Sequence, residues 1–273
     1  VISGSRIIRT TNGNYNTASR KGYLYERSSI DDSTYTFISD EMAINDSLEI
    51  GEFRGNAILR TKDSLSFDMM ANNIKSDRKN SILLATEMPM LLIKQPKDTL
   101  YIHADTLYGA KITQLKREIP ASRDSVSTLQ DTTKNKYFEA FHNVIIYSDS
   151  LQARCDSLFY SMADSTIRLL GHPIVWTNNN QITGDTIYLY INNKKPEGLK
   201  VFNNAFAINK LDSVELYNQM RGNQILVWFQ NGSIAKMVTK GNAESIYFVQ
   251  DDHKDLIGMN SASAQIMEVN FEE

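Results

Sequence analysis

The chain has 273 residues, of which 41% are hydrophobic and 22% charged, so it can form one large all-β domain or two smaller domains with a packed core. Its 29 Lys and Arg side chains nearly balance 32 Asp and Glu side chains, which argues against nucleic acid or an anionic membrane surface as the partner. No apolar run approaches the roughly 20 residues that span a bilayer. The single cysteine excludes an internal disulfide.

Short strands are expected from the first residues onward. Asn12-Gly13 and Asn231-Gly232 each stand between alternating runs, and this dipeptide is the strongest short sign of a β-hairpin. In residues 141–191 the apolar side chains recur at every second position, which is typical of strands with one buried face and excludes an amphipathic helix.

A tripeptide, Asp-[Ser/Thr]-[Leu/Ile/Val], recurs along the chain. The nine copies begin at Asp46, Asp63, Asp98, Asp105, Asp124, Asp149, Asp156, Asp185 and Asp212. The Asp and the hydroxyl residue suit a strand corner, where their side chains bond local backbone N–H groups, and the apolar residue then turns inward. Longer frames begin at Asn56, Asn143 and Asn204, each followed by apolar residues and then by another copy of the tripeptide. Such an imperfect repeat predicts a stacked β architecture in which each layer buries the next.

Residues 114–136 interrupt this pattern. Charged residues, Ser and Thr dominate there, so we expect a long surface loop. Two interpretations of the loop stay open: a tolerated insertion, which the composition favours, and a recognition loop.

The sequence offers little for catalysis. His103, His142, His172 and His253 have no metal-ligand spacing to each other or to a cysteine, and Cys155 stands at an inward strand position with no base near it in sequence. There is no Gly-rich phosphate loop and no calcium-loop spacing of the Asp residues. We therefore expect no catalytic residue, no metal site and no cofactor.

The inward apolar face has two interpretations. It fills a solid core between two sheets about 10 Å apart, or it lines a slot that accepts a lipid chain, since each buried methylene contributes roughly 0.8 kcal/mol. Composition alone favours the solid core.

The order of the motifs in residues 141–158, 184–190 and 241–247 resembles the OstA/LptA family of periplasmic lipopolysaccharide-transport proteins, in particular the OstA-like proteins of the Bacteroidetes type. The resemblance implies an all-β fold, a twisted antiparallel β-jellyroll stacked like a solenoid and open at both ends. Residues 1–113 and 137–273 would be its two continuous parts, and 114–136 a polar insertion that the compact family member lacks.

The resemblance also implies a function without catalysis. Family members shield the acyl chains of lipid A in an apolar groove during export to the outer membrane. Their partners are lipopolysaccharide and the β-jellyroll domains of inner- and outer-membrane export components, and they join head to tail by pairing edge strands. A periplasmic location follows, with a signal peptide that has been removed or trimmed. The candidate groove residues are the inward apolar members of the matching strands: Leu65, Phe67, Met69, Met90, Leu92, Leu100, Ile102, Leu107, Val144, Ile146, Leu151, Ala153, Trp176, Ile187 and Leu189.

Two alternatives come from other classes. One is a structural β-solenoid scaffold that assembles end to end and binds no lipid. The other is a carbohydrate-active β-helix enzyme, which would need clustered carboxylates on one exposed face, whereas the outward charges here are scattered.

Overall fold

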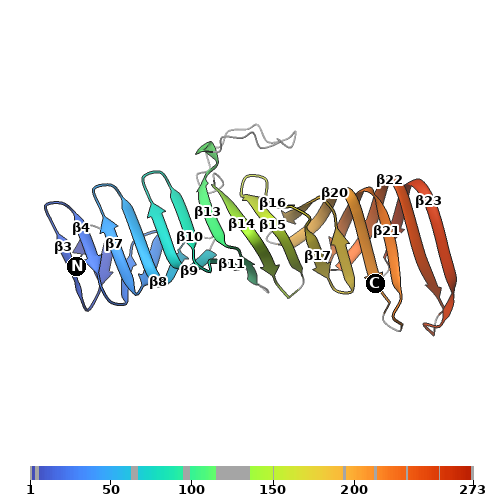
Figure 1. Cartoon of the computed structure of the whole chain (residues 1–273), viewed down its shortest axis with the longest axis horizontal. Coiled ribbons are helices and arrows are strands. Elements are labelled where there is room, and N and C mark those ends of the chain that lie inside the picture. The colour runs from blue at the N-terminus through green and yellow to red at the C-terminus, as the bar shows by residue number, and fades with distance from the viewer. Residues whose placement is uncertain are drawn as a thin grey trace. The chain divides into compact units, whose positions relative to one another are not determined.

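The computed structural model describes residues 2–3, 6–62, 67–94, 99–114, 136–149, 151–192, 195–211, 214–231, 233–251 and 253–271. The chain forms two compact units (Figure 1). Unit 1 consists of Val1–Val144 with Ser161–Asp164, and unit 2 of Ile145–Tyr160 with Ser165–Glu273. The sequence-based division at residues 113/114 and 136/137 stays a prediction, because nearly all of the expected insertion lies outside the described residues.

Unit 1 is built from short antiparallel strands and one turn of 3₁₀ helix. Its elements are β1 (Ile2–Ser3), β2 (Arg6–Arg9), β3 (Gly13–Asn16), β4 (Lys21–Leu24), β5 (Ser28–Asp31), β6 (Tyr35–Ser39), β7 (Glu41–Asn45), β8 (Ile50–Thr61), β9 (Phe67–Asp77), β10 (Ile82–Thr86), β11 (Met90–Lys94), β12 (Thr99–His103), β13 (Thr106–Lys111), η1 (Ile112–Gln114) and the start of β14 (Lys136–Tyr147).

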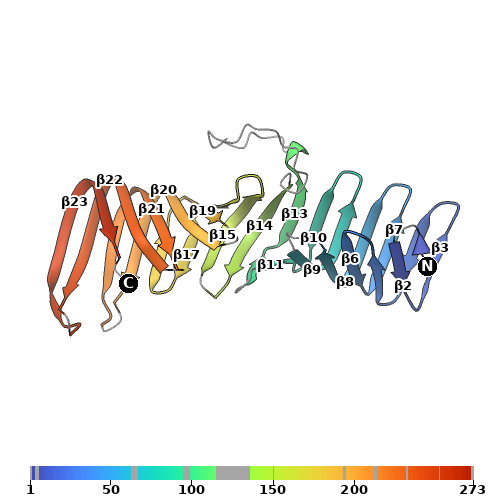
Figure 2. The same cartoon turned by 180° about the vertical axis from the view of Figure 1, so that it is seen from behind.

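These strands form two walls. Wall A contains β2, β5, β6, the second half of β8, the first half of β9, β11 and β12 (Figure 2). Wall B contains β3, β4, β7, the first half of β8, the second half of β9, β10, β13 and the start of β14 (Figure 1). The long strands β8 and β9 belong to both walls, because their pairing register shifts between Arg54 and Ala57, where the chain turns a corner.

The core of unit 1 consists of side chains in register across neighbouring strands. In wall A the buried row is Ile8, Ile30, Phe37, Leu59, Met69, Leu91 and Ile102. In wall B it is Leu24, Met42, Phe53, Ile74, Ala85, Leu107 and Ala140. The rows meet face to face, as in the stacked rings of Phe37 and Phe53, whose centroids are 4.1 Å apart. Burying each large side chain stabilises the fold by about 1.5–3 kcal/mol.

Unit 2 repeats the same plan, and its last four strands are longer than those of unit 1. Its elements are the end of β14, β15 (Gln152–Ser161), β16 (Thr166–Leu170), β17 (Ile174–Thr177), β18 (Asn180–Thr183), β19 (Thr186–Asn192), β20 (Lys195–Lys210), β21 (Tyr217–Gln230), β22 (Ser233–Gln250) and β23 (Leu256–Asn270). Strands β20, β21 and β22 each change register midway, so each contributes to two walls. One inward row contains Leu169, Ile187, Val201, Ile225 and Thr239, all without exposed surface.

The corners explain the sequence repeats. Asn56, Asn143 and Asn204 each have a left-handed backbone, with φ of 46°, 52° and 47°, which Asn tolerates better than most residues. Each donates its side-chain amide to an aspartate that lies between two neighbouring strands, at distances of 2.8–3.1 Å. These aspartates are Asp40, Asp105 and Asp185.

The backbone N–H of the same aspartate donates to the backbone carbonyl of the residue just before the Asn. Each corner is therefore held by two hydrogen bonds, one from the Asn side chain and one from the backbone of the Asp. The corner role expected for the tripeptide is therefore confirmed for Asp105 and Asp185. Their partner is different from the expected one, because the carboxylate accepts from an Asn side chain of the next layer.

The predicted all-β antiparallel architecture is confirmed by these pairings. The hairpin expected at Asn231-Gly232 joins β21 to β22, with Gln230 opposite Ser233. The hairpin expected at Asn12-Gly13 is wrong, since β2 pairs with β5 and β3 pairs with β4. There the chain passes from wall A to wall B, and a corner between walls uses the same turn residues as a hairpin.

Replacement of Asn204 tests the corner. The variant Asn204→Ala loses the bond to Asp185 and places at positive φ a residue that tolerates this conformation less well than Asn, so we expect the free energy of unfolding to fall by about 1–2 kcal/mol. Asn204→Gly loses the same bond but accepts the conformation, so its loss should be smaller. Urea denaturation of both variants measures the difference. Equal losses for the two would contradict a role of the left-handed backbone.

Candidate functional site

Along the inward face of unit 1, the side chains are apolar in the middle of the strands. They become charged at those ends of the strands that lie away from the Asn corners. Side chains two residues apart share a face of a strand, so Arg6 lies on the same face as the buried Ile8, and Asp46 on the same face as the buried Ile44. The same spacing places Arg20, Asp32, Glu49, Arg78 and Lys136 next to the inward positions of their strands. We call these seven charged residues the rim.

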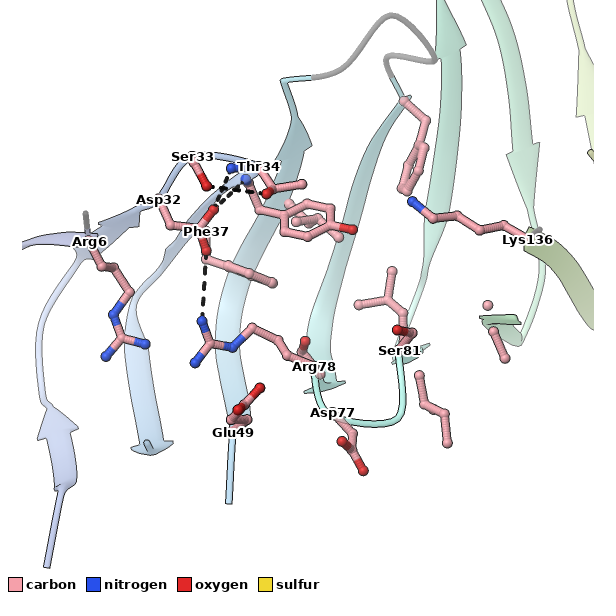
Figure 3. A pocket seen from close by; sticks show the side chains of 18 of the residues that line it. Arg6, Asp32, Ser33, Thr34, Phe37, Glu49, Asp77, Arg78, Ser81 and Lys136 are labelled. Carbon is pink, nitrogen blue, oxygen red and sulfur yellow. Dashed lines mark hydrogen bonds and ion pairs between the residues drawn. The ribbon is translucent and has the colours of Figure 1, made fainter. Parts of the chain in front are cut away.

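A cavity of about 690 Å³ lies between the walls of unit 1 below the rim (Figure 3). Its size is within the range of ligand sites, roughly 300–1,000 Å³. Apolar side chains form its floor: Tyr35, Phe37, Leu59, Phe67, Ile82, Leu83, Ala110, Tyr137 and Phe138. The rings of Phe67 and Phe138, from opposite walls, meet edge to face at 5.1 Å between centroids. The cavity is therefore a short groove with an apolar floor and a charged rim.

One end of the groove is closed by ion pairs between the walls. Arg6 of wall A donates to the carboxylate of Asp46 at the end of wall B, and both side chains are nearly buried, with 11% and 7% of their surface exposed. Arg78 lies 3.9 Å from both Asp46 and Asp32, and Tyr15 donates its hydroxyl to Asp46 at 2.9 Å. We call these five residues the clasp.

The clasp shifts the pKa values of two of its members, Asp46 and Tyr15. Burial by itself would raise the pKa of Asp46, but the hydrogen bonds from Arg6 and Tyr15 and the charges of Arg6 and Arg78 outweigh it, so the pKa lies below the usual value. Burial, together with the bond to Asp46, raises the pKa of Tyr15. Asp46 is thus a carboxylate at neutral pH, and it holds the walls together at this end of the groove.

Eleven of the fifteen groove candidates lie on buried faces. In unit 1 these are Phe67, Met69, Leu100, Ile102, Leu107 and Val144, and in unit 2 Ile146, Leu151, Ala153, Ile187 and Leu189. Of the eleven, Phe67 lines the cavity. Burial places these side chains on the inward face, and ligand binding by them stays a prediction.

Three candidates lie on the wrong face. Met90 and Leu92 are partly exposed, and Leu91 between them is buried in the row of wall A. Trp176 is also partly exposed, with its indole N–H donating to Gln181, and Val175 takes the inward position.

The three misplaced candidates lie in two runs of consecutive apolar residues, 90–93 and 174–176. In such a run, an alternation with a period of two does not reveal which residues point inward. Leu65, the remaining candidate, lies outside the described residues.

The sequence did not single out the rim. A signal was present at four of its residues, each a charged residue two positions from the outermost buried apolar residue of its strand: Arg6, Asp32, Asp46 and Lys136. Asp46 was noticed only as one of the repeated aspartates. Recognising the others required the wall to which each strand belongs, which depends on the three-dimensional pairing.

Other chemistry is limited in the described part of the chain. Cys155 is buried, and burial raises the pKa of its thiol to about 12, so it stays protonated at neutral pH. The described residues contain no cluster of three or more His, Cys, Asp or Glu side chains that could hold a metal ion. Within the same residues, no helix is long and apolar enough to cross a membrane.

The clasp predicts a pH-dependent stability. The folded-state pKa of Asp46 lies below the unfolded value of about 3.9, so its contribution is complete above that value and is lost as the pH falls through the folded-state pKa. Asp46→Asn should lower the free energy of unfolding by about 2 kcal/mol at pH 7, because Arg6 loses its charged acceptor.

Urea denaturation between pH 2 and pH 7 checks this expectation. The difference between Asp46→Asn and the unaltered protein should shrink at the acid end of the series. Glu49→Gln is the matched control, because Glu49 is a rim carboxylate without an ion pair to another described residue. A difference that stays constant with pH would contradict the role of the Asp46 charge.

No protein-family model matches the chain, and no curated protein matches it. Among solved structures it is similar to LptH, described as the LptA-homologous periplasmic component of the lipopolysaccharide transport device of Pseudomonas aeruginosa. The two share 11% sequence identity with a TM-score of 0.22, over 57% of this chain and 74% of LptH.

Proposed function

We propose that this protein is a non-enzymatic carrier that binds the acyl chains of lipopolysaccharide between its β-walls during export to the outer membrane. The observation that carries the proposal is the groove of unit 1, with its apolar floor and charged rim. An amphiphile needs both features, because its chains gain free energy by leaving water while its head group must stay solvated.

The size of the groove supports a lipid chain as the occupant. Each methylene moved from water to an apolar wall contributes about 0.8 kcal/mol, so a dozen methylenes contribute on the order of 10 kcal/mol before the costs of association. The aromatic rings of Phe37, Phe67 and Phe138 are among the apolar side chains that line the groove. The order of sequence motifs that resembles the OstA/LptA family is what selects lipopolysaccharide among lipids.

The proposal also includes where the protein acts and which proteins it contacts. A carrier of this kind works in the periplasm, takes lipopolysaccharide from one β-jellyroll domain and passes it to another. The partners would be β-jellyroll domains of inner- and outer-membrane export components, or a second copy of the chain, joined by edge-strand pairing.

A scaffold that binds no lipid is the second candidate. The observation that favours it is the tight packing of the inward rows, since Met69, Ile74, Ile187, Val201 and Ile225 have no exposed surface. A solid interior accepts a chain only if the walls separate. The two candidates therefore differ in whether lipid reaches the inward face.

Photo-crosslinking distinguishes them. A benzophenone side chain in place of Tyr35, which lines the groove, should label lipopolysaccharide when the purified protein is mixed with it and irradiated. The matched control replaces Tyr23, which is 48% exposed on the outward face of β4. Labelling should be several-fold stronger from position 35. Equal labelling from both positions, or none from either, would contradict the carrier and favour the scaffold.

A further inference from the structure

Lys136 occupies the rim at the far end of the groove from the clasp. It is the first residue of β14 and shares a strand face with Phe138 and Ala140, both of which are buried. It lines the cavity, and Figure 3 shows its side chain extended from β14 into the space between the walls. Its ammonium group is therefore presented to whatever fills the groove.

The charge on Lys136 differs from those of the clasp. Arg6 and Arg78 are matched by Asp46 and Asp32. In the described part of the chain, no carboxylate lies within 4 Å of the Lys136 ammonium group. An ammonium group beside an apolar wall is poorly solvated on that side, and a charge-assisted hydrogen bond to an anion compensates for this.

We propose that Lys136 binds the anionic group, a carboxylate or a phosphate, of an amphiphile whose acyl chain lies on the floor of the groove. The inference rests on the proposed carrier function and fixes the direction of the bound molecule. The chain runs inward past Phe138 and Phe67, and the anionic head stays at the mouth on Lys136. Arg6 and Arg78 are neutralised by Asp46 and Asp32, so these two cations of the rim do not compete for the anion.

Three probes with one chain length test the proposal: dodecanoate, dodecyl phosphate and the uncharged dodecanol. Their affinities are measured at pH 8 by displacement of a fluorescent apolar dye from the full chain. Lys136→Met should weaken the binding of the two anions about tenfold, because it removes a charged hydrogen bond. It should change the binding of dodecanol by less than a factor of about two, since the apolar floor is intact.

Further variants show whether a change in binding comes from the charge at position 136 or from a folding defect. Lys136→Gln repeats the measurement with a polar side chain, and Lys136→Glu should reverse the preference, so that dodecylamine binds more tightly than dodecanoate. Lys21→Met is the matched control, because Lys21 is exposed on the outward face of β4 and should leave all affinities unchanged. Circular dichroism verifies that each variant retains its β-structure.

The outcomes separate the inference from the function on which it rests. Anion binding that weakens while dodecanol binding persists supports the proposal, and a loss with only one anion identifies the head group. Equal effects on all three probes, or none, would overturn the role of Lys136 and leave the carrier intact. If the unaltered protein binds no probe, both the carrier and the role of Lys136 are wrong.

Discussion

The structure depends on one constraint, the register that keeps the inward positions of successive strands opposite each other. A shift of one residue would move every apolar side chain of a strand to the outer face. In wall A the row from Ile8 to Ile102 crosses seven strands without such a shift, and the register breaks fall at the corners. Because each layer buries the one before it, no strand is stable alone, and the packing of the whole unit fixes each position.

The corners allow a strand to pass from one wall to the other while its apolar side chains stay on the inward face. At the left-handed pair Gly55-Asn56 the pairing register of the strand shifts, and Phe53 and Ala57 on either side both stay buried although they belong to different walls. The carboxylate of Asp40 then ties the corner to the preceding layer. The same solution at Asn143 and Asn204 shows that the sequence repeat encodes corners, and the strands between them need only alternate.

Sequence reasoning recovered what alternation and turn chemistry encode locally. It predicted the all-β class, the corner role of Asp105 and Asp185, and the inward faces of strands in which polar and apolar residues alternate cleanly. It was wrong at Met90, Leu92 and Trp176, because in a run of apolar residues either parity satisfies the pattern, and only the neighbouring strands decide. The rim was also out of reach, since Arg6 and Asp46 are 40 residues apart and meet only when walls A and B face each other.

The position along each strand at which inward side chains change from apolar to charged is limited by the cost of burying an unpaired charge. At the rim, Asp46 is stabilised by Arg6 and Tyr15, whereas a carboxylate two residues deeper, at Ile44, would lie in the apolar row without a partner and cost several kcal/mol. The boundary therefore falls at the same place in strands far apart in the sequence, between Ile8 and Arg6 and between Phe138 and Lys136. At the clasp, Arg6 and Arg78 pair with Asp46 and Asp32 and hold the walls together. Among the described residues no carboxylate lies within 4 Å of the Lys136 ammonium group, so at that point the boundary carries a cation that no ion pair neutralises.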